Sequence, residues 1–231
     1  MRARTPNVSK FRDWPFDFDD DTRLEHYVGY VRASGRSRAA NIEAFFRATF
    51  DAWKDVRRSG EEKVYVGYSP ALTVDAELVL ADIPGAHFLH VVRNPWSAYA
   101  DTKKRPVPLP LGEYMLCWTL NQYFATLFAA QHPDRFHIVR TEDLMADPVA
   151  TLSKVLAKLG LSSSEALGTP IWNGTALPEV YPWGTIRTAT TAANRATAAE
   201  LSAEECAAVA ERGAHYIDVF DYAGLDPRGA H

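Results

Sequence analysis

The order of hydrophobic and polar positions near the N-terminus is typical of helices. One apolar stripe recurs at the spacing of a helical face, so we expect a helix that Asp21 or Thr22 caps and Gly35 ends. A longer stripe with the same period predicts a second helix over residues 41–57. The first stripe consists of Leu24, Tyr27, Val28 and Val31.

Further along, short apolar runs alternate with helical patterns. Runs rich in β-branched and aromatic residues predict strands at 63–68, 87–92 and 135–139, and the middle run is apolar enough to be buried on both faces. This alternation predicts an α/β fold with a parallel β-sheet flanked by helices, formed by one domain over residues 1–231. The accompanying helices are expected at 76–83, from Trp96, at 111–131, from Pro148 to Gly160, and from Ser202, where Glu205 completes a capping box.

Composition and net charge limit the classes of protein to which this chain can belong. The chain has 231 residues, of which 47% are hydrophobic and 23% charged, as in globular domains. Its 25 Lys and Arg against 29 Asp and Glu give a net charge of −4, which argues against nucleic acid as a partner. With no signal sequence or membrane span in view, we expect a cytoplasmic protein that has no membrane partner. Cys117 and Cys206 are then expected as two buried thiols, and one long-range disulfide between them is the alternative. Nothing in the sequence indicates the oligomeric state.

Arg93 is the clearest candidate for binding chemistry. It follows a predicted central strand and precedes Pro95, where a helix begins. Ligands of open parallel sheets sit beyond the carboxyl ends of strands, and free N–H groups at a helix start favour anions. Arg93 therefore either forms a phosphate-binding fork or pairs with a nearby carboxylate as a structural clamp.

Two stretches resemble one known family. They are HFLHVVRNPWSAYADTKKR and, later, FHIVRTEDLMADPVATLSKVLAKLGL. In order and spacing, from about residue 63 to 161, they resemble the sulfotransferases that use 3′-phosphoadenosine 5′-phosphosulfate (PAPS). This resemblance implies the sulfotransferase fold related to the P-loop nucleoside-triphosphate hydrolases, with PAPS as sulfuryl donor and no metal.

The resemblance assigns the 3′-phosphate site. Arg93 matches the arginine that grips this phosphate. The family's second ligand is a serine eight residues later, where this chain has Asp101, which would repel a phosphate. Ser97 or Thr102 is expected to supply the hydroxyl instead; we favour Ser97, because it lies in the first turn of the helix, although a simple capping role is the alternative.

Other basic residues are candidates of the same kind. Arg187 and Arg195 lie in the region where the family presents a basic loop to the 3′-phosphate, although exposed loop arginines are common. Residues 103–105, Lys-Lys-Arg, are interpreted as a steering patch or as a solvated face. Thr141 stands where the family has a tyrosine near the adenine.

Two family elements have no clear counterpart. The nearest match to the phosphosulfate loop is residues 34–37, Ser-Gly-Arg-Ser, which follow a helical stripe and not a strand. One hypothesis is that the chain is N-terminally truncated and begins after the family's first strand; the other is that this strand was lost. The family's histidine base is absent after Tyr68, which leaves Asp75 and His26 as weak catalytic candidates; Asp75 is alternatively a helix cap.

The expected function is sulfuryl transfer from PAPS to a hydroxyl or amine of a small-molecule or glycan acceptor. The alternative is a non-catalytic sulfotransferase-like binding protein that has lost donor activation. A phosphoryl-transfer enzyme would need a Gly-x-x-x-x-Gly-Lys-Ser/Thr loop, and this sequence has none.

Overall fold

The computed structural model describes residues 17–62, 64–68, 72–105, 107–172, 175–176 and 190–229. The chain divides into two compact units. Unit 1 comprises residues 1–70, 78–85 and 171–176, and unit 2 comprises residues 71–77, 86–170 and 177–231. The short helix α3 (Ala76–Asp82), predicted at 76–83, contains one of the boundaries.

The first helix of unit 1 is α1 (Asp20–Ser34), which packs against α2. Its cap is Asp19 and not the predicted Asp21 or Thr22, because the Asp19 carboxylate accepts the free N–H groups of both residues. Gly35 ends the helix as predicted, with a φ of 88° that disfavours residues other than glycine.

The second helix, α2 (Arg38–Asp51), begins and ends earlier than its apolar stripe predicted. Ser37 caps it by accepting the N–H of Ala40 at 3.1 Å. After Asp51 the backbone pairs with the segment that precedes α1: Asp19 N donates to Ala52 O at 3.0 Å and Lys54 N to Asp17 O at 2.9 Å. These two backbone hydrogen bonds take the place of the i to i−4 bonds that would have continued the helix.

The strand predicted at 63–68 is wrong for the residues described there, 64–68, which form no strand. Tyr65 stacks on Phe46 with ring centroids 3.8 Å apart, whereas Val66 and Tyr68 are 85% and 86% exposed. Without a neighbouring strand, the intrinsic β-propensity of this run does not produce a strand. The structure describes one pair of short strands in unit 1, β3 (Ile171–Trp172) and β4 (Thr175–Ala176), which pair antiparallel.

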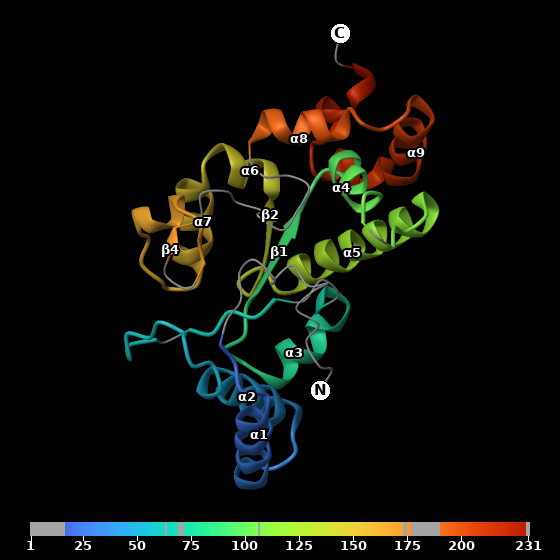
Figure 1. The fold of residues 1–231 in the computed structure, drawn as a ribbon. Helices are drawn as coiled ribbons and strands as arrows, with labels where there is room; N and C mark the ends of the chain where they lie inside the picture. The colour runs from blue at the N-terminus through green and yellow to red at the C-terminus, as the bar shows by residue number, and fades with distance from the viewer. Residues whose placement is uncertain are drawn as a thin grey trace. The chain divides into compact units, whose positions relative to one another are not determined.

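Unit 2 is built around two parallel strands, β1 (Phe88–Val92) and β2 (Phe136–Arg140), both close to their predicted ranges. Phe88 pairs with Phe136, and Val92 with Arg140, so the two strands end at the same edge (Figure 1). The prediction that β1 is buried on both faces is wrong, because Leu89 and Val91 are 44% and 51% exposed.

The helices of unit 2 confirm most of the predicted ranges, and Ser202 with Glu205 forms the predicted capping box. The core contains Trp96, Tyr99, Met115, Val209 and Tyr222, and Figure 1 shows α4, α8 and α9 near the carboxyl ends of the strands. The helices are α4 (Pro95–Thr102), α5 (Leu111–Gln131), α6 (Thr141–Ala146), α7 (Pro148–Lys158), α8 (Thr191–Ala198) and α9 (Ala203–Val219). Short 3₁₀ helices occupy Leu72–Asp75, Glu165–Gly168, Ala223–Leu225 and Pro227–Gly229.

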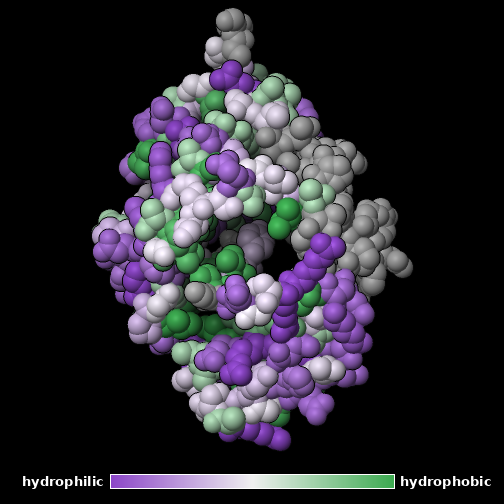
Figure 2. All heavy atoms as spheres, turned by 90° about the vertical axis from the view of Figure 1, so that its left-hand side faces the viewer, coloured by the Kyte–Doolittle hydropathy of each residue, from purple (hydrophilic) through white to green (hydrophobic). Residues whose placement is uncertain are grey.

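The architecture is therefore α/β, with parallel strands flanked by helices as predicted. On the face shown in Figure 2, polar residues cover most of the outer surface and hydrophobic residues appear in smaller groups. Within the described ranges, no helix combines the length and apolar character needed to cross a membrane. Cys117 and Cys206 are free thiols as expected, but Cys117 is exposed and Cys206 is buried.

Histidines occupy both faces of the strand pair. His90 is half-buried between Gln122, with Nε2 2.8 Å from Oε1, and Thr73, with Nδ1 3.1 Å from Oγ1. His87 is exposed, and its ring stacks on that of the buried His137 with centroids 5.7 Å apart. Burial lowers the pKa of His90 and of His137, and Lys158 and His87 lower that of His137 further.

These lowered pKa values predict acid sensitivity. Both histidines bind protons more weakly when folded than when unfolded, so their contribution to stability is complete above an unfolded pKa of about 6.5 and is lost as pH falls toward the folded values. We expect the melting temperature to fall between about pH 7 and about pH 5. His137→Phe keeps the stacked ring and removes one titrating group, so it should flatten this dependence; equal slopes in both proteins would contradict the assignment.

Candidate functional site

A polar cluster lies at the carboxyl ends of the two parallel strands. β1 ends at Val92 and is followed by Arg93 and Asn94, while β2 leads directly into α6, which carries Glu142. Asn194 joins them from α8, far along the chain. Parallel pairing brings the two strand ends together, and the packing of α8 on α4 adds the third element.

Glu142 is the centre of the cluster. Its Oε1 accepts hydrogen bonds from the backbone N–H of Asn94 at 3.1 Å, from Asn94 Nδ2 at 2.7 Å and from Asn194 Nδ2 at 3.0 Å. Glu142 is 8% exposed and each asparagine 2%, so these bonds form away from water. They fix the start of α4 against the starts of α6 and α8.

Tyr222 lies in the core of unit 2 and contacts the end of β1, from which Arg93 and Asn94 follow. It is fully buried, and its hydroxyl donates to Val92 O at 3.3 Å, at the last residue of β1. Burial raises the pKa of Tyr222, and the Glu142 carboxylate raises it further. The phenol therefore stays neutral and keeps its proton for this bond.

Arg93 is held on several sides. Its Nε donates to Ser97 Oγ at 2.9 Å and to Asn194 Oδ1 at 3.0 Å, and its carbonyl accepts from Trp118 Nε1 at 3.2 Å. Its Nη1 pairs with Asp101 Oδ2 at 2.6 Å. Its Nη2 is buried and makes no hydrogen bond to any residue that the structure describes.

The structure brings Ser97 to Arg93, but not Thr102. Ser97 is fully buried in the first turn of α4; its N–H donates to Asn94 Oδ1 at 3.0 Å, so Asn94 is the cap of this helix and Ser97 is not. Thr102 donates its hydroxyl to Ala98 O at 2.8 Å, within its own helix. Of the two hydroxyls considered for the phosphate site, only that of Ser97 contacts the arginine.

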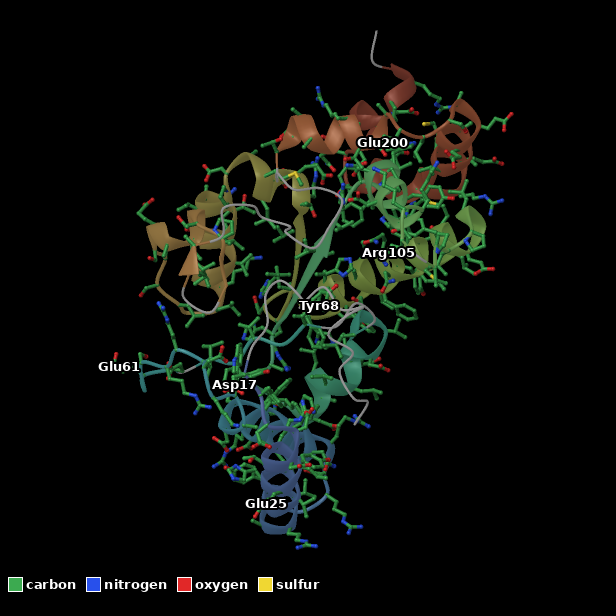
Figure 3. The ribbon with its side chains drawn as sticks, in the orientation of Figure 1. Asp17, Glu25, Glu61, Tyr68, Arg105 and Glu200 are labelled. Carbon is green, nitrogen blue, oxygen red and sulfur yellow. The ribbon has the colours of Figure 1, made fainter. Side chains whose placement is uncertain are left out.

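The basic residues after α4 differ in how they are used. Lys103 pairs with both oxygens of Glu205, at 2.9 and 2.8 Å, and thereby ties α4 to α9. Lys104 pairs with Glu200, which Figure 3 labels. These two cations serve as structural ion pairs, whereas Arg105, also labelled, is exposed.

Of the two C-terminal arginines, the structure describes Arg195, and Arg187 lies outside the described residues. Arg195 is exposed on α8, directly after Asn194, and has no ion-pair partner in the described part of the chain. Arg195 therefore places a positive charge at the surface, next in the chain to Asn194, which contacts Arg93.

Neither candidate base belongs to the hydrogen-bonded cluster. Asp75 is exposed at the end of the 3₁₀ helix Leu72–Asp75 and has no hydrogen bond to any residue of the cluster. His26 belongs to unit 1, where its Nδ1 lies 3.4 Å from Asp51 Oδ2; the same oxygen accepts the Tyr30 hydroxyl at 2.6 Å. The hydrogen bond to Asp51 raises the pKa of Tyr30.

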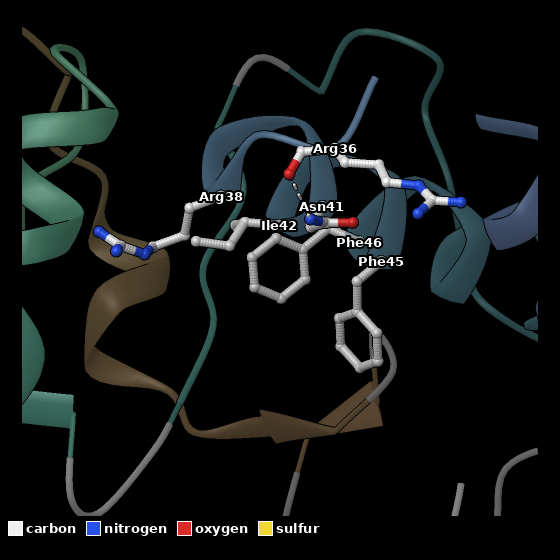
Figure 4. Close-up of a pocket in the computed structure, with 6 residues that line it drawn as sticks. All are labelled: Arg36, Arg38, Asn41, Ile42, Phe45 and Phe46. Atoms are coloured by element: carbon white, nitrogen blue, oxygen red, sulfur yellow. Dashed lines mark hydrogen bonds between the residues drawn. The ribbon is translucent and has the colours of Figure 1, made fainter. Parts of the chain in front are cut away.

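Residues 34–37, the nearest match to a phosphosulfate loop, connect α1 to α2 and do not follow a strand. Close by, a surface hollow of about 410 Å³ has Phe45 and Phe46 among its lining residues (Figure 4). The guanidinium groups of Arg36 and Arg38 point in opposite directions there, and Arg38 pairs with Asp82 at 2.6 Å. The arginines therefore do not converge on one anion.

Sequence reasoning missed two members of the cluster. Asn194 contacts Arg93 across 101 residues, and Tyr222 contacts Val92 across 130. No spacing rule relates such distant positions. In the ranges that the structure describes, no group of three or more His, Cys, Asp or Glu residues is arranged to hold a metal ion.

Comparison with known proteins identifies the family. Residues 5–165 match the model of the sulfotransferase family, so the chain belongs to this family, and the resemblance found in the sequence is confirmed. No curated protein matches the chain. A solved structure that it matches is the sulfotransferase domain from the curacin biosynthetic pathway, at 15% identity, over 88% of this chain and 82% of that one, with a TM-score of 0.44.

Proposed function

We propose that this sulfotransferase-family protein transfers a sulfuryl group from PAPS to a hydroxyl or amine of a small molecule or glycan. The observation that carries the proposal is the position of Arg93, which lies at the carboxyl end of β1, next to the N-terminus of α4. Ser97 and Asn194 orient its guanidinium, and its buried Nη2 makes no hydrogen bond to the described residues. An arginine so placed suits a phosphate.

In this proposal the chain's own residues have distinct roles. Arg93 binds the 3′-phosphate of the donor, Ser97 and Asn194 position Arg93, and Arg187 and Arg195 contribute positive charge. The acceptor oxygen or nitrogen attacks sulfur in line, the bond from sulfur to the bridging oxygen of the 5′-phosphate breaks, and a base takes the acceptor's proton. Asp75 and His26 are the candidates for that base.

Binding of the desulfated donor, 3′-phosphoadenosine 5′-phosphate (PAP), tests the site. Arg93→Ala removes the charged donor and should weaken PAP binding by about 1–3 kcal/mol in isothermal titration. Arg228→Ala is the matched control, because Arg228 pairs with its neighbour Asp226 at 2.6 Å and does not contact the cluster. Unchanged affinity in the Arg93 variant would move the site elsewhere.

A second candidate function is nucleotide binding without catalysis. One observation favours it: residues 34–37 connect two helices and do not form a strand-to-helix phosphate loop. A panel of hydroxyl and amine acceptors with labelled PAPS separates the candidates. Transfer of label supports the enzyme, whereas PAP binding without transfer supports the binding protein.

A further inference from the structure

Asp101 stands where the resemblance places a serine ligand of the phosphate, and it contacts Arg93. The two side chains, eight residues apart, meet across one face of α4, with Arg93 Nη1 2.6 Å from Asp101 Oδ2. They are 21% and 18% exposed, so the pair is accessible from solvent at its rim. In this chain a carboxylate thus occupies a donor that an incoming anion would need.

The hydrogen bonds that Arg93 already makes limit how a phosphate could bind to it. A bidentate contact to phosphate needs two adjacent N–H groups of the guanidinium. Nε already donates to Ser97 and Asn194, one N–H of Nη1 is paired with Asp101, and Nη2 makes no hydrogen bond to the residues that the structure describes. A phosphate on the Nη1–Nη2 edge would use the second N–H of Nη1, which places its oxygens beside the Asp101 carboxylate; the repulsion between these like charges favours displacement of the carboxylate.

Charge leads to the same conclusion. The Asp101 carboxylate offsets the charge of Arg93, and Glu142, which bonds to Asn94 and Asn194, adds a second acid to the cluster. Lys103 and Lys104 are paired with other acids. A phosphate next to Arg93 would therefore meet an adjacent negative charge as long as Asp101 stays in place.

We propose that Asp101 is a built-in competitor of the nucleotide: its carboxylate holds Arg93 in the free protein, and the 3′-phosphate of the donor must displace it. The proposal rests on the proposed function, and it makes Asp101 a determinant of affinity and of the preference for a 3′-phosphate. A nucleotide without a 3′-phosphate does not compete with the carboxylate for Arg93, so its affinity should not depend on Asp101.

The test compares two nucleotides that differ only at the 3′ position, PAP and adenosine 5′-monophosphate, by isothermal titration. Asp101→Ser should tighten PAP binding by about tenfold or more, the effect of roughly 1.4 kcal/mol, and leave the monophosphate unchanged. Asp101→Asn keeps an oxygen near Arg93 while removing the charge, so it should show a smaller gain in the same direction. Melting temperatures establish that both variants fold.

Glu200→Gln is the matched control, since it makes the same change of net charge in an acid that pairs with Lys104 and not with Arg93. Equal gains for Asp101→Ser and Glu200→Gln, equal gains for both nucleotides, or no gain for PAP would each overturn the competitor role while leaving the proposed function intact. If PAP binds neither the unaltered protein nor Asp101→Ser, the proposed function fails and the competitor role fails with it.

Discussion

Glu142→Ala is expected to destabilise unit 2 by about 3–4 kcal/mol, because it leaves several buried donors without an acceptor. The backbone N–H and side-chain amide of Asn94 and the amide of Asn194 all donate to the same carboxylate oxygen. These groups are nearly inaccessible to water. Chemical denaturation with urea, read as a lower midpoint at constant slope, measures the loss.

Asp143→Asn is the matched control, because this adjacent carboxylate is 54% exposed and its contact with Arg140 is 3.9 Å long. Surface ion pairs of this kind are worth about 0–1 kcal/mol. Glu142→Gln keeps one oxygen acceptor and should lie between the two. A loss from Glu142→Ala no larger than that from Asp143→Asn would show that water replaces the carboxylate.

Trp96→Ala is expected to destabilise the same unit by about 3–5 kcal/mol, through loss of apolar burial and the cavity that remains. Trp96 is 1% exposed in the core of unit 2, and its indole Nε1 donates to Cys206 O at 3.2 Å, which joins α4 to α9. The expected readout is a large fall in the urea midpoint, accompanied by weaker PAP binding, because α4 carries Ser97, which positions Arg93.

Trp96→Phe separates the two contributions. It keeps most of the apolar volume and loses the hydrogen bond, so a loss of about 1–2 kcal/mol is expected. If Trp96→Ala lowered the midpoint no more than Trp96→Phe, the core around α4 would have to collapse onto the cavity.

Local signals predicted most of the secondary structure. Helix α5 has its predicted bounds, Gly35 ends α1, and the capping box at Ser202 forms. Each of these depends on residues within a few positions of one another, where spacing and capping chemistry decide. The prediction of a strand at 63–68 is wrong for the described residues 64–68, because a strand also needs a partner strand, which no local pattern supplies.

The candidate site shows the same division. The sequence by itself placed Arg93 at the end of a strand and the start of a helix, and marked Asp101 as a departure from the family. Only the tertiary structure decided that Asp101 pairs with Arg93, that Asn194 orients it, and that Glu142 links three elements. Position along a strand or helix follows from local propensity, whereas partners about 50 to 100 residues away meet only when the packing of the whole unit brings them together.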